Sequence, residues 1–387
     1  MNMTSAPRHG RRHAHGFTLV ELMVAMTIGI AIIGIMLAVY LNSRTSGVRQ
    51  SQLSDLQQSV RTAFDYLVSD VRGVGHQGCF TGRTGATVSV AGLAATLPTN
   101  YAVGVEGFDY NTTGTDLTLS TYDPADTTDN SAWSTNTSGV TQIPTTTIGG
   151  ATGISPDSDV LVLRGVVGRP LRLTAATAAA AVSLPLESVT TGVTCTTGNA
   201  LSGLCASSHA LIASCTQAQF FQVESTSTTA LAVPAAHPIA SAYSEMSEVF
   251  PVQTVVYYVK KSVSGKGTSL YRRVFDGNQG GANGLEQELI EGIENLQVRY
   301  GVDDDPAGTI RGNVGSYKRA NEIPDWSRVV AVRMSILLRS STAVEGIDLP
   351  ATAPMNGMTV TFPTDGPKYD RRVFTTTVAL RNRVAYN

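Results

Sequence analysis

The chain has 387 residues, a formal net charge of −2 and only 15% charged residues. This length is enough to bury a large hydrophobic core in one large domain or two lobes. The charge balance lacks the excess of lysine and arginine with which proteins bind nucleic-acid phosphates, so nucleic-acid binding is not expected.

The N-terminal segment contains a predicted membrane helix. Residues 22–41 are twenty consecutive residues without a charge, and a helix of this length spans roughly the 30 Å of the hydrocarbon layer. A secretory signal has a shorter apolar run that ends at a small-residue cleavage site. The positive charge is denser before this helix, at residues 8–12, than after it. We therefore expect a cytoplasmic leader and an exported C-terminal domain.

Glu21 is an unusual residue at the start of this apolar run. A charge at the centre of a bilayer costs about 2.5 to 3.5 kcal/mol, and less near a helix end where water is close. Two interpretations stay open at this point. Glu21 is either a carboxylate wetted at the membrane surface or one that requires a cationic partner.

The string GFTLVELMVAMTIG, residues 16–29, resembles the N-terminal signal of type IV prepilins and of type II secretion pseudopilins. The shared features are a basic leader that ends in Gly, a following Phe, a Glu at the fifth position of the mature chain and an unbroken apolar helix. The resemblance implies that prepilin peptidase removes residues 1–16 by cutting between Gly16 and Phe17, and then methylates the amine of Phe17. It also implies that Glu21 is the carboxylate used in assembly.

Physical chemistry supports such a pairing. Cleavage creates a cation at Phe17, and Glu21 of a neighbouring subunit could neutralise it within a bundle of apolar helices. Burial of either charge alone is costly, whereas pairing offsets that cost and sets the axial register between subunits. Residues 17–41 are thus expected to form a helix of the membrane and of the filament core.

The helix is predicted to continue through residues 42–75. Apolar residues recur there at three- and four-residue steps, as expected for one face of an amphipathic helix: Leu53, Leu56, Val60, Phe64, Leu67, Val68 and Val71. Gly73, Gly75 and Gly78 then end the pattern. We expect this half of the helix to pack on its own domain and to contribute to the filament core.

Two β-rich regions follow. Residues 76–250 are rich in Thr, Ser and Gly, and strands are expected at residues 116–121, 159–165 and 219–225, joined by long loops. Residues 251–387 carry stronger strand patterns at residues 252–261, 269–275, 295–302, 327–340 and 371–383. The first two of these flank a Gly-containing hairpin loop. The predicted fold class is α+β: a pilin-like fold in which one long N-terminal helix packs on antiparallel β-sheet.

Three C-terminal stretches, residues 288–305, 325–340 and 369–383, resemble minor pilins of the PilW type, and so does DVRGVGHQGC at residues 70–79. The similarity covers residues 10–80 and 250–387, whereas residues 81–250 resemble no family. It implies a low-abundance subunit that primes assembly at the filament tip. The implied partners are other major and minor pilins, prepilin peptidase, the inner-membrane assembly platform, a tip adhesin and membrane lipid.

The four cysteines, Cys79, Cys195, Cys205 and Cys215, contain no Cys-x-x-Cys pair, so a zinc knuckle or a thioredoxin-like site is not indicated. Export makes disulfides the default expectation. Four cysteines allow three pairings, and all three stay open.

No enzyme activity, cofactor or metal is expected. Outside the leader only His76, His209 and His237 remain, and no Gly-x-Ser-x-Gly elbow exists. The position of His209 between two cysteines fits no common zinc spacing. Lys266 lacks the earlier glycine of a phosphate-binding loop.

Two further groups of residues are weak candidates for metal ligands. Asp303, Asp304 and Asp305 either bind calcium or form a solvated turn. Their consecutive spacing does not match the alternating ligands of a helix-loop calcium site, so we expect a solvated turn. Met355 and Met358 have no nearby His or Cys, and we expect ordinary loop methionines.

The predicted function is that of a minor pilin in type IV pilus assembly, in a tip or priming complex, by non-covalent polymerisation through the N-terminal helix. Before assembly the chain is expected to cross the inner membrane once with a periplasmic C-terminal domain, and afterwards to lie in the pilus. The alternatives are a type II secretion minor pseudopilin and a membrane-tethered periplasmic binding domain that does not polymerise.

Overall fold

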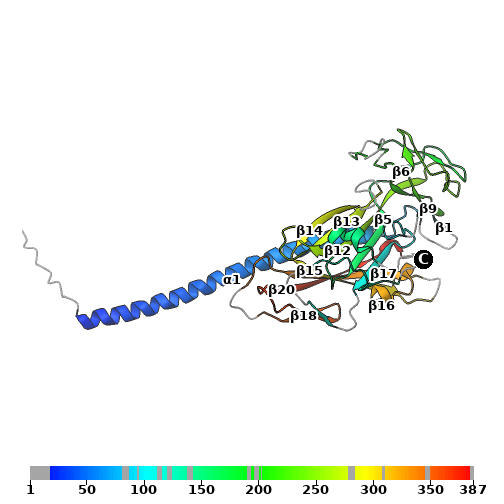
Figure 1. Ribbon diagram of the computed structural model, residues 1–387. Coiled ribbons are helices and arrows are strands. Elements are labelled where there is room, and N and C mark those ends of the chain that lie inside the picture. The colour runs from blue at the N-terminus through cyan, green and yellow to red at the C-terminus, as the bar shows by residue number, and fades with distance from the viewer. Residues whose placement is uncertain are drawn as a thin grey trace, which may run out of the picture. The chain divides into compact units, whose positions relative to one another are not determined.

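The computed structural model describes residues 18–80, 87–93, 96–110, 116–119, 124–136, 143–189, 193–195, 200–201, 203–277, 284–306, 310–344 and 349–383 (Figure 1). The chain divides into two compact units at Ser54, and each is described by itself. The predicted cleavage site at Gly16 and Phe17 lies outside the described residues.

Helix α1 runs from Leu19 to Gly73, and its part up to Ser54 belongs to the first unit. Its first half is almost purely apolar, and those side chains are exposed, with Leu19 at 74% and Ile30 at 70% of their full accessibility. One continuous helix thus runs from Leu19 through the regions predicted as a membrane helix and as its amphipathic continuation, and ends at Gly73. Positive φ angles at Gly75 and Gly78 then turn the chain away from the helix.

The second unit is built around a ten-stranded sheet with the order β1-β9-β8-β12-β5-β2-β4, to which β13, β14 and β6 are added. The long strand β12, Glu248–Lys261, is its centre and pairs with four other strands. The pairing of β1 with β9 is parallel. The other strands are β1 Thr87–Val90, β2 Val105–Tyr110, β4 Trp133–Ser134, β5 Val160–Val166, β6 Leu171–Arg172, β8 His209–Ala213, β9 Gln217–Gln222, β13 Thr268–Phe275 and β14 Leu285–Glu291.

An antiparallel four-stranded sheet follows, with the order β16-β15-β17-β20. Its strands are β15 Ile293–Asp303, β16 Val314–Lys318, β17 Val329–Arg339 and β20 Arg371–Ala379. The predicted boundary between residues 250 and 251 falls inside β12. Strands from both of these sequence regions pair in the ten-stranded sheet.

Two small sheets and several short helices complete the unit. One sheet contains β10 Ser225–Thr226, β11 Ala230–Ala232 and β7 Ser183–Pro185, and the other contains β18 Thr352–Met355, β19 Met358–Thr361 and β3 Asp116–Thr118. The short helices are α2 Thr145–Gly149, η1 Gly150–Thr152, η3 Ala320–Glu322, η4 Trp326–Arg328 and η5 Arg381–Arg383.

The main hydrophobic core joins the C-terminal part of α1 to both large sheets (Figure 1). Leu67 and Val71 of the helix are fully buried in the same cluster as Tyr257 of β12 and Val298 of β15. Each large apolar side chain buried in this way contributes about 1.5 to 3 kcal/mol. The α+β prediction, with a long helix packed on β-sheet, is confirmed.

Polar contacts also connect the C-terminal part of α1 to the rest of the second unit. Asp70 of α1 accepts a hydrogen bond from the hydroxyl of Tyr257 at 2.6 Å and one from Nε of Arg272 at 2.9 Å. At the end of the helix, Nδ2 of Asn382 donates to the carbonyl oxygen of Arg72 at 3.0 Å. Since the last carbonyls of a helix have no partner within it, this amide helps to cap α1.

Candidate assembly site

The first turn of α1 is closed by a capping box between Thr18 and Glu21. Oε2 of Glu21 accepts hydrogen bonds from the backbone nitrogen and from the hydroxyl of Thr18, both at 2.9 Å. In return the backbone nitrogen of Glu21 donates to Oγ1 of Thr18 at 3.2 Å. These bonds satisfy donors that every helix N-terminus leaves unpaired.

The sequence analysis missed the role of Thr18. A Thr followed three residues later by a Glu, directly before an apolar run, is a recognisable signature of a helix start. The carboxylate is also favoured at this position by the positive end of the helix dipole.

The cap leaves one oxygen of Glu21 available. Both hydrogen bonds from Thr18 end on Oε2, and no described residue donates a hydrogen bond to Oε1. A carboxylate oxygen accepts up to two hydrogen bonds. The arrangement can therefore hold Glu21 in one orientation and still receive a cation at Oε1.

The surface beyond Glu21 is apolar. In length and composition α1 suffices to cross a membrane, and its apolar stretch is not buried within the protein. Large side chains exposed here include Leu22, Met26, Ile30 and Ile33. An apolar surface of this extent requires a cover of lipid or of other apolar helices.

The four cysteines form two disulfides, Cys79–Cys215 and Cys195–Cys205. The structure thereby selects one of the three pairings. The first bond closes a separation of 136 residues and ties the loop after α1 to the turn between β8 and β9. The second closes a separation of only 10 residues.

The three histidines lie in different environments. His76 packs edge-on against Phe250, with ring centroids 5.9 Å apart, and His237 is exposed. His209 of β8 is buried, and its Nδ1 lies 3.1 Å from the hydroxyl of Tyr101. Burial lowers the pKa of His209 to about 4, although Asp276 opposes the shift. In the part of the chain that the structure describes, no cluster of His, Cys, Asp or Glu could hold a metal.

The expectation of a solvated turn is wrong for Asp303. Its side chain is fully buried at the end of β15 and accepts hydrogen bonds from the backbone nitrogens of Asp305, Arg311 and Gly312, at 2.7 to 2.9 Å. Burial raises the pKa of Asp303, but these bonds and Arg328 outweigh burial and lower the pKa below its ordinary value. Asp303 thus organises the loop, whereas Asp304 is exposed.

The expectation of loop methionines is also wrong. Met355 ends β18 and Met358 begins β19, so they flank the two-residue turn of a hairpin, and both are buried. Sδ of Met358 lies 3.4 Å from a guanidinium nitrogen of Arg299. Their thioethers serve packing because the strands turn both side chains into the protein.

Buried charges connect segments that are distant in sequence, and sequence analysis did not find them. Glu106 and Arg164 form a fully buried ion pair at 2.6 Å between β2 and β5. Asp159 accepts hydrogen bonds from the backbone nitrogens of Tyr110 in β2 and Val298 in β15, and so links the two large sheets. Burial, together with the nearby Asp109, raises the pKa of Asp159 to about 8.

Comparison with known families locates two matches. Residues 256–382 match the family model of type IV pilus-assembly protein W, and residues 11–41 match the model of the prokaryotic N-terminal methylation motif. No match to a curated protein was found. The first match begins within β12 and covers the whole four-stranded sheet, and the second contains Glu21 and the apolar half of α1. The two matches, with the long apolar helix and the sheet packed on its second half, support a type IV pilus minor pilin of the PilW type.

Proposed function

We propose that this pilin assembles by non-covalent polymerisation through α1, as a subunit of a tip or priming complex of the type IV pilus. The observation that carries this proposal is Glu21, held by Thr18 at the start of an exposed apolar helix with Oε1 available. Besides capping its own helix, such a carboxylate can recognise a cation on an adjacent helix.

The assembly step follows from charge pairing. Cleavage between Gly16 and Phe17 frees an amine at Phe17, which is methylated and keeps its positive charge. When the apolar helices of two subunits pack, this amine meets Oε1 of Glu21 while Thr18 retains Oε2. A neighbour packed at a different axial position leaves both charges unpaired in an apolar environment. This costs several kcal/mol per ion, so such a neighbour is rejected.

This mechanism defines the location and the partners. Before assembly α1 crosses the inner membrane once, in contact with lipid, and the domain with its two disulfides lies in the periplasm. Afterwards the chain is part of the pilus at the cell surface. Its partners are other major and minor pilins, prepilin peptidase, the inner-membrane platform and a tip adhesin. The protein acts by binding and not by catalysis, and it requires no cofactor.

The decisive experiment separates the charge of Glu21 from its capping role. Glu21→Gln keeps an oxygen that accepts the hydrogen bonds of Thr18 but removes the charge, whereas Glu21→Ala removes both. Both variants should enter the membrane normally, and both should be depleted at least tenfold from sheared pili on quantitative immunoblots, since about 1.4 kcal/mol of lost pairing suffices for that factor.

Normal incorporation of Glu21→Gln would contradict charge pairing. A mature N-terminus that retains residues 1–16 in cells with an active prepilin peptidase, as read by mass spectrometry, would contradict polymerisation altogether. That result would favour a simple membrane tether.

A further inference from the structure

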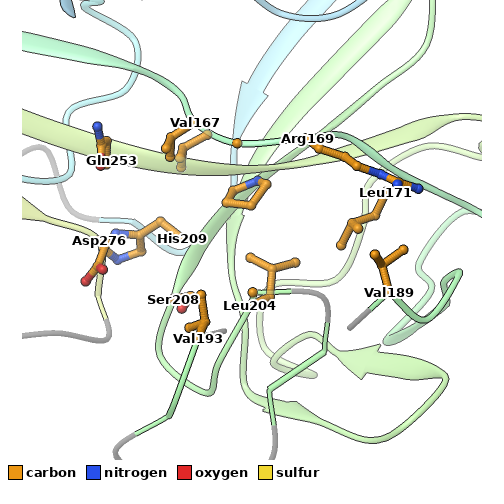
Figure 2. A pocket seen from close by; sticks show the side chains of 14 residues that line it. Val167, Arg169, Leu171, Val189, Val193, Leu204, Ser208, His209, Gln253 and Asp276 are labelled. Atoms are coloured by element: carbon orange, nitrogen blue, oxygen red, sulfur yellow. The ribbon is translucent and has the colours of Figure 1, made fainter. Parts of the chain in front are cut away.

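A cavity of about 280 Å³ lies in the second unit, at the ends of β5 and β12 (Figure 2). Its walls are mostly apolar and include Val167, Leu171, Leu204 and Val252. This volume is close to the lower limit of about 300 Å³ for ligand pockets in proteins. Most of the residues that line the cavity lie outside both family matches.

One end of the cavity is polar. Figure 2 shows His209 and Asp276 next to each other at this end, and Leu171 away from them on the other side of the cavity. The two polar residues are neighbours through the backbone as well, because the nitrogen of His209 donates to the carbonyl oxygen of Asp276 at 3.3 Å. The lining is thus mostly apolar, with His209 and Asp276 at one end and Arg169 beside Leu171.

His209 is held in a fixed orientation. Its Nδ1 lies 3.1 Å from the hydroxyl of Tyr101, and the ring of Tyr101 stacks on Phe220 with centroids 5.1 Å apart. No described residue forms a hydrogen bond with Nε2 of His209. The burial that lowers the pKa of His209 to about 4 keeps the imidazole neutral near pH 7. A neutral imidazole presents either a donor or an acceptor at Nε2, according to its tautomer.

The opposite wall is held by a disulfide. Gly203 and Leu204 line the cavity directly before Cys205, which is bonded to Cys195. The backbone nitrogen of Cys205 also donates to Oγ of Ser208, at 3.2 Å, and Ser208 lines the cavity as well. Strands and a covalent bond therefore fix the walls on both sides.

We propose that this cavity is a binding site for a small uncharged molecule with a compact apolar body and one hydroxyl group placed at Nε2 of His209. A hydroxyl both donates and accepts, so it matches either tautomer of the imidazole. Arg169 in the lining is already paired with Glu187 at 3.2 Å and most of the wall is apolar, so the cavity favours an uncharged ligand, and its volume excludes an oligomeric one. This site is independent of the assembly role of α1.

The test uses the full-length processed protein in detergent, with histidine labelled by ¹⁵N, and 4-ethylphenol as the probe. The processed chain contains His76, His209 and His237, so few imidazole signals have to be assigned. Saturable shifts confined to His209 are expected. Ethylbenzene, which has the same skeleton without the hydroxyl, should bind about tenfold more weakly, the typical effect of one hydrogen bond.

Two variants control for position. Val167→Phe fills the cavity from a position that is 37% exposed and should abolish the shifts, whereas Val182→Phe, at a position that is 44% exposed and outside the lining, should leave them unchanged. His209→Leu, whose side chain has no hydrogen-bonding group, should remove the preference for 4-ethylphenol over ethylbenzene in saturation-transfer measurements on the probes. The proposal is overturned if His209 does not respond to either probe, or if Val167→Phe binds as the wild type does.

Discussion

Cys79 and Cys215 are joined by a disulfide that connects the loop after α1 to the turn between β8 and β9. Cys79 follows the helix that enters the main core, and Cys215 lies in the part of the chain that matches no family model. The bond thus anchors the β-rich middle region to the part of the helix that packs on the sheets.

The two disulfides should differ in their contribution to stability. In the chain-entropy account a cross-link over 136 residues contributes about 5 kcal/mol and one over 10 residues about 3 kcal/mol. Replacement of Cys79 and Cys215 by Ser should therefore reduce the free energy of unfolding more than the same replacement of Cys195 and Cys205. Urea unfolding of the detergent-solubilised protein measures both values, and the reverse order would refute the ranking.

The cap at Thr18 should tune assembly. Thr18→Val keeps the shape of the side chain but removes the hydroxyl that contacts Glu21, whereas Thr18→Ser retains it. Loss of a helix cap costs about 0.5 to 2 kcal/mol. The valine variant should consequently be depleted from sheared pili by about 2- to 30-fold, less than or equal to the effect of Glu21→Ala. Equal depletion of the serine variant would show that the hydroxyl is not responsible.

His209 should make the protein less stable in acid. Its pKa of about 4 in the folded state lies below the 6.5 of an unperturbed imidazole. Between these values the unfolded chain binds the proton and the folded chain does not, so stability is lost as the pH falls. Between pH 8 and pH 5 this loss is about 2 kcal/mol.

The control for this pH effect is a second histidine. His209→Gln should flatten the dependence of unfolding free energy on pH by that amount, whereas His237→Gln, at an exposed position, should not. Parallel curves for the wild type and His209→Gln would contradict the assignment to His209.

Asp303 should be a structural carboxylate that does not depend on calcium. Asp303→Ala leaves three backbone N–H groups without their acceptor and should destabilise the protein by about 3 kcal/mol. Asp304→Ala, at the exposed neighbouring position, should change stability by at most about 0.5 kcal/mol. Thermal unfolding in calcium and in chelator should coincide, and a calcium-dependent midpoint would revive the metal interpretation.

Sequence patterns predicted the elements with strong periodicity. The apolar run and the steps of three and four residues defined α1, and the β-branched runs located β12, β13, β15, β17 and β20. In these segments local propensity and burial favour the same structure. Met355 and Met358 were expected in a loop because the stretch APMNGM contains Pro, Asn and Gly. Only Asn356 and Gly357 form a turn there, and the two methionines belong to the strands of the hairpin.

The sequence by itself determined the anchor, because the length of an apolar helix and the position of Glu21 in it are linear properties of the chain. Only the tertiary structure decided which cysteines pair, that Asp303 is buried, and that His209 faces a cavity beside Asp276. These contacts depend on how strands from distant parts of the chain are ordered in the sheets. Sequence patterns alone do not reveal that strand order, because many strand orders bury a similar area of apolar surface. The folded backbone has only one of them.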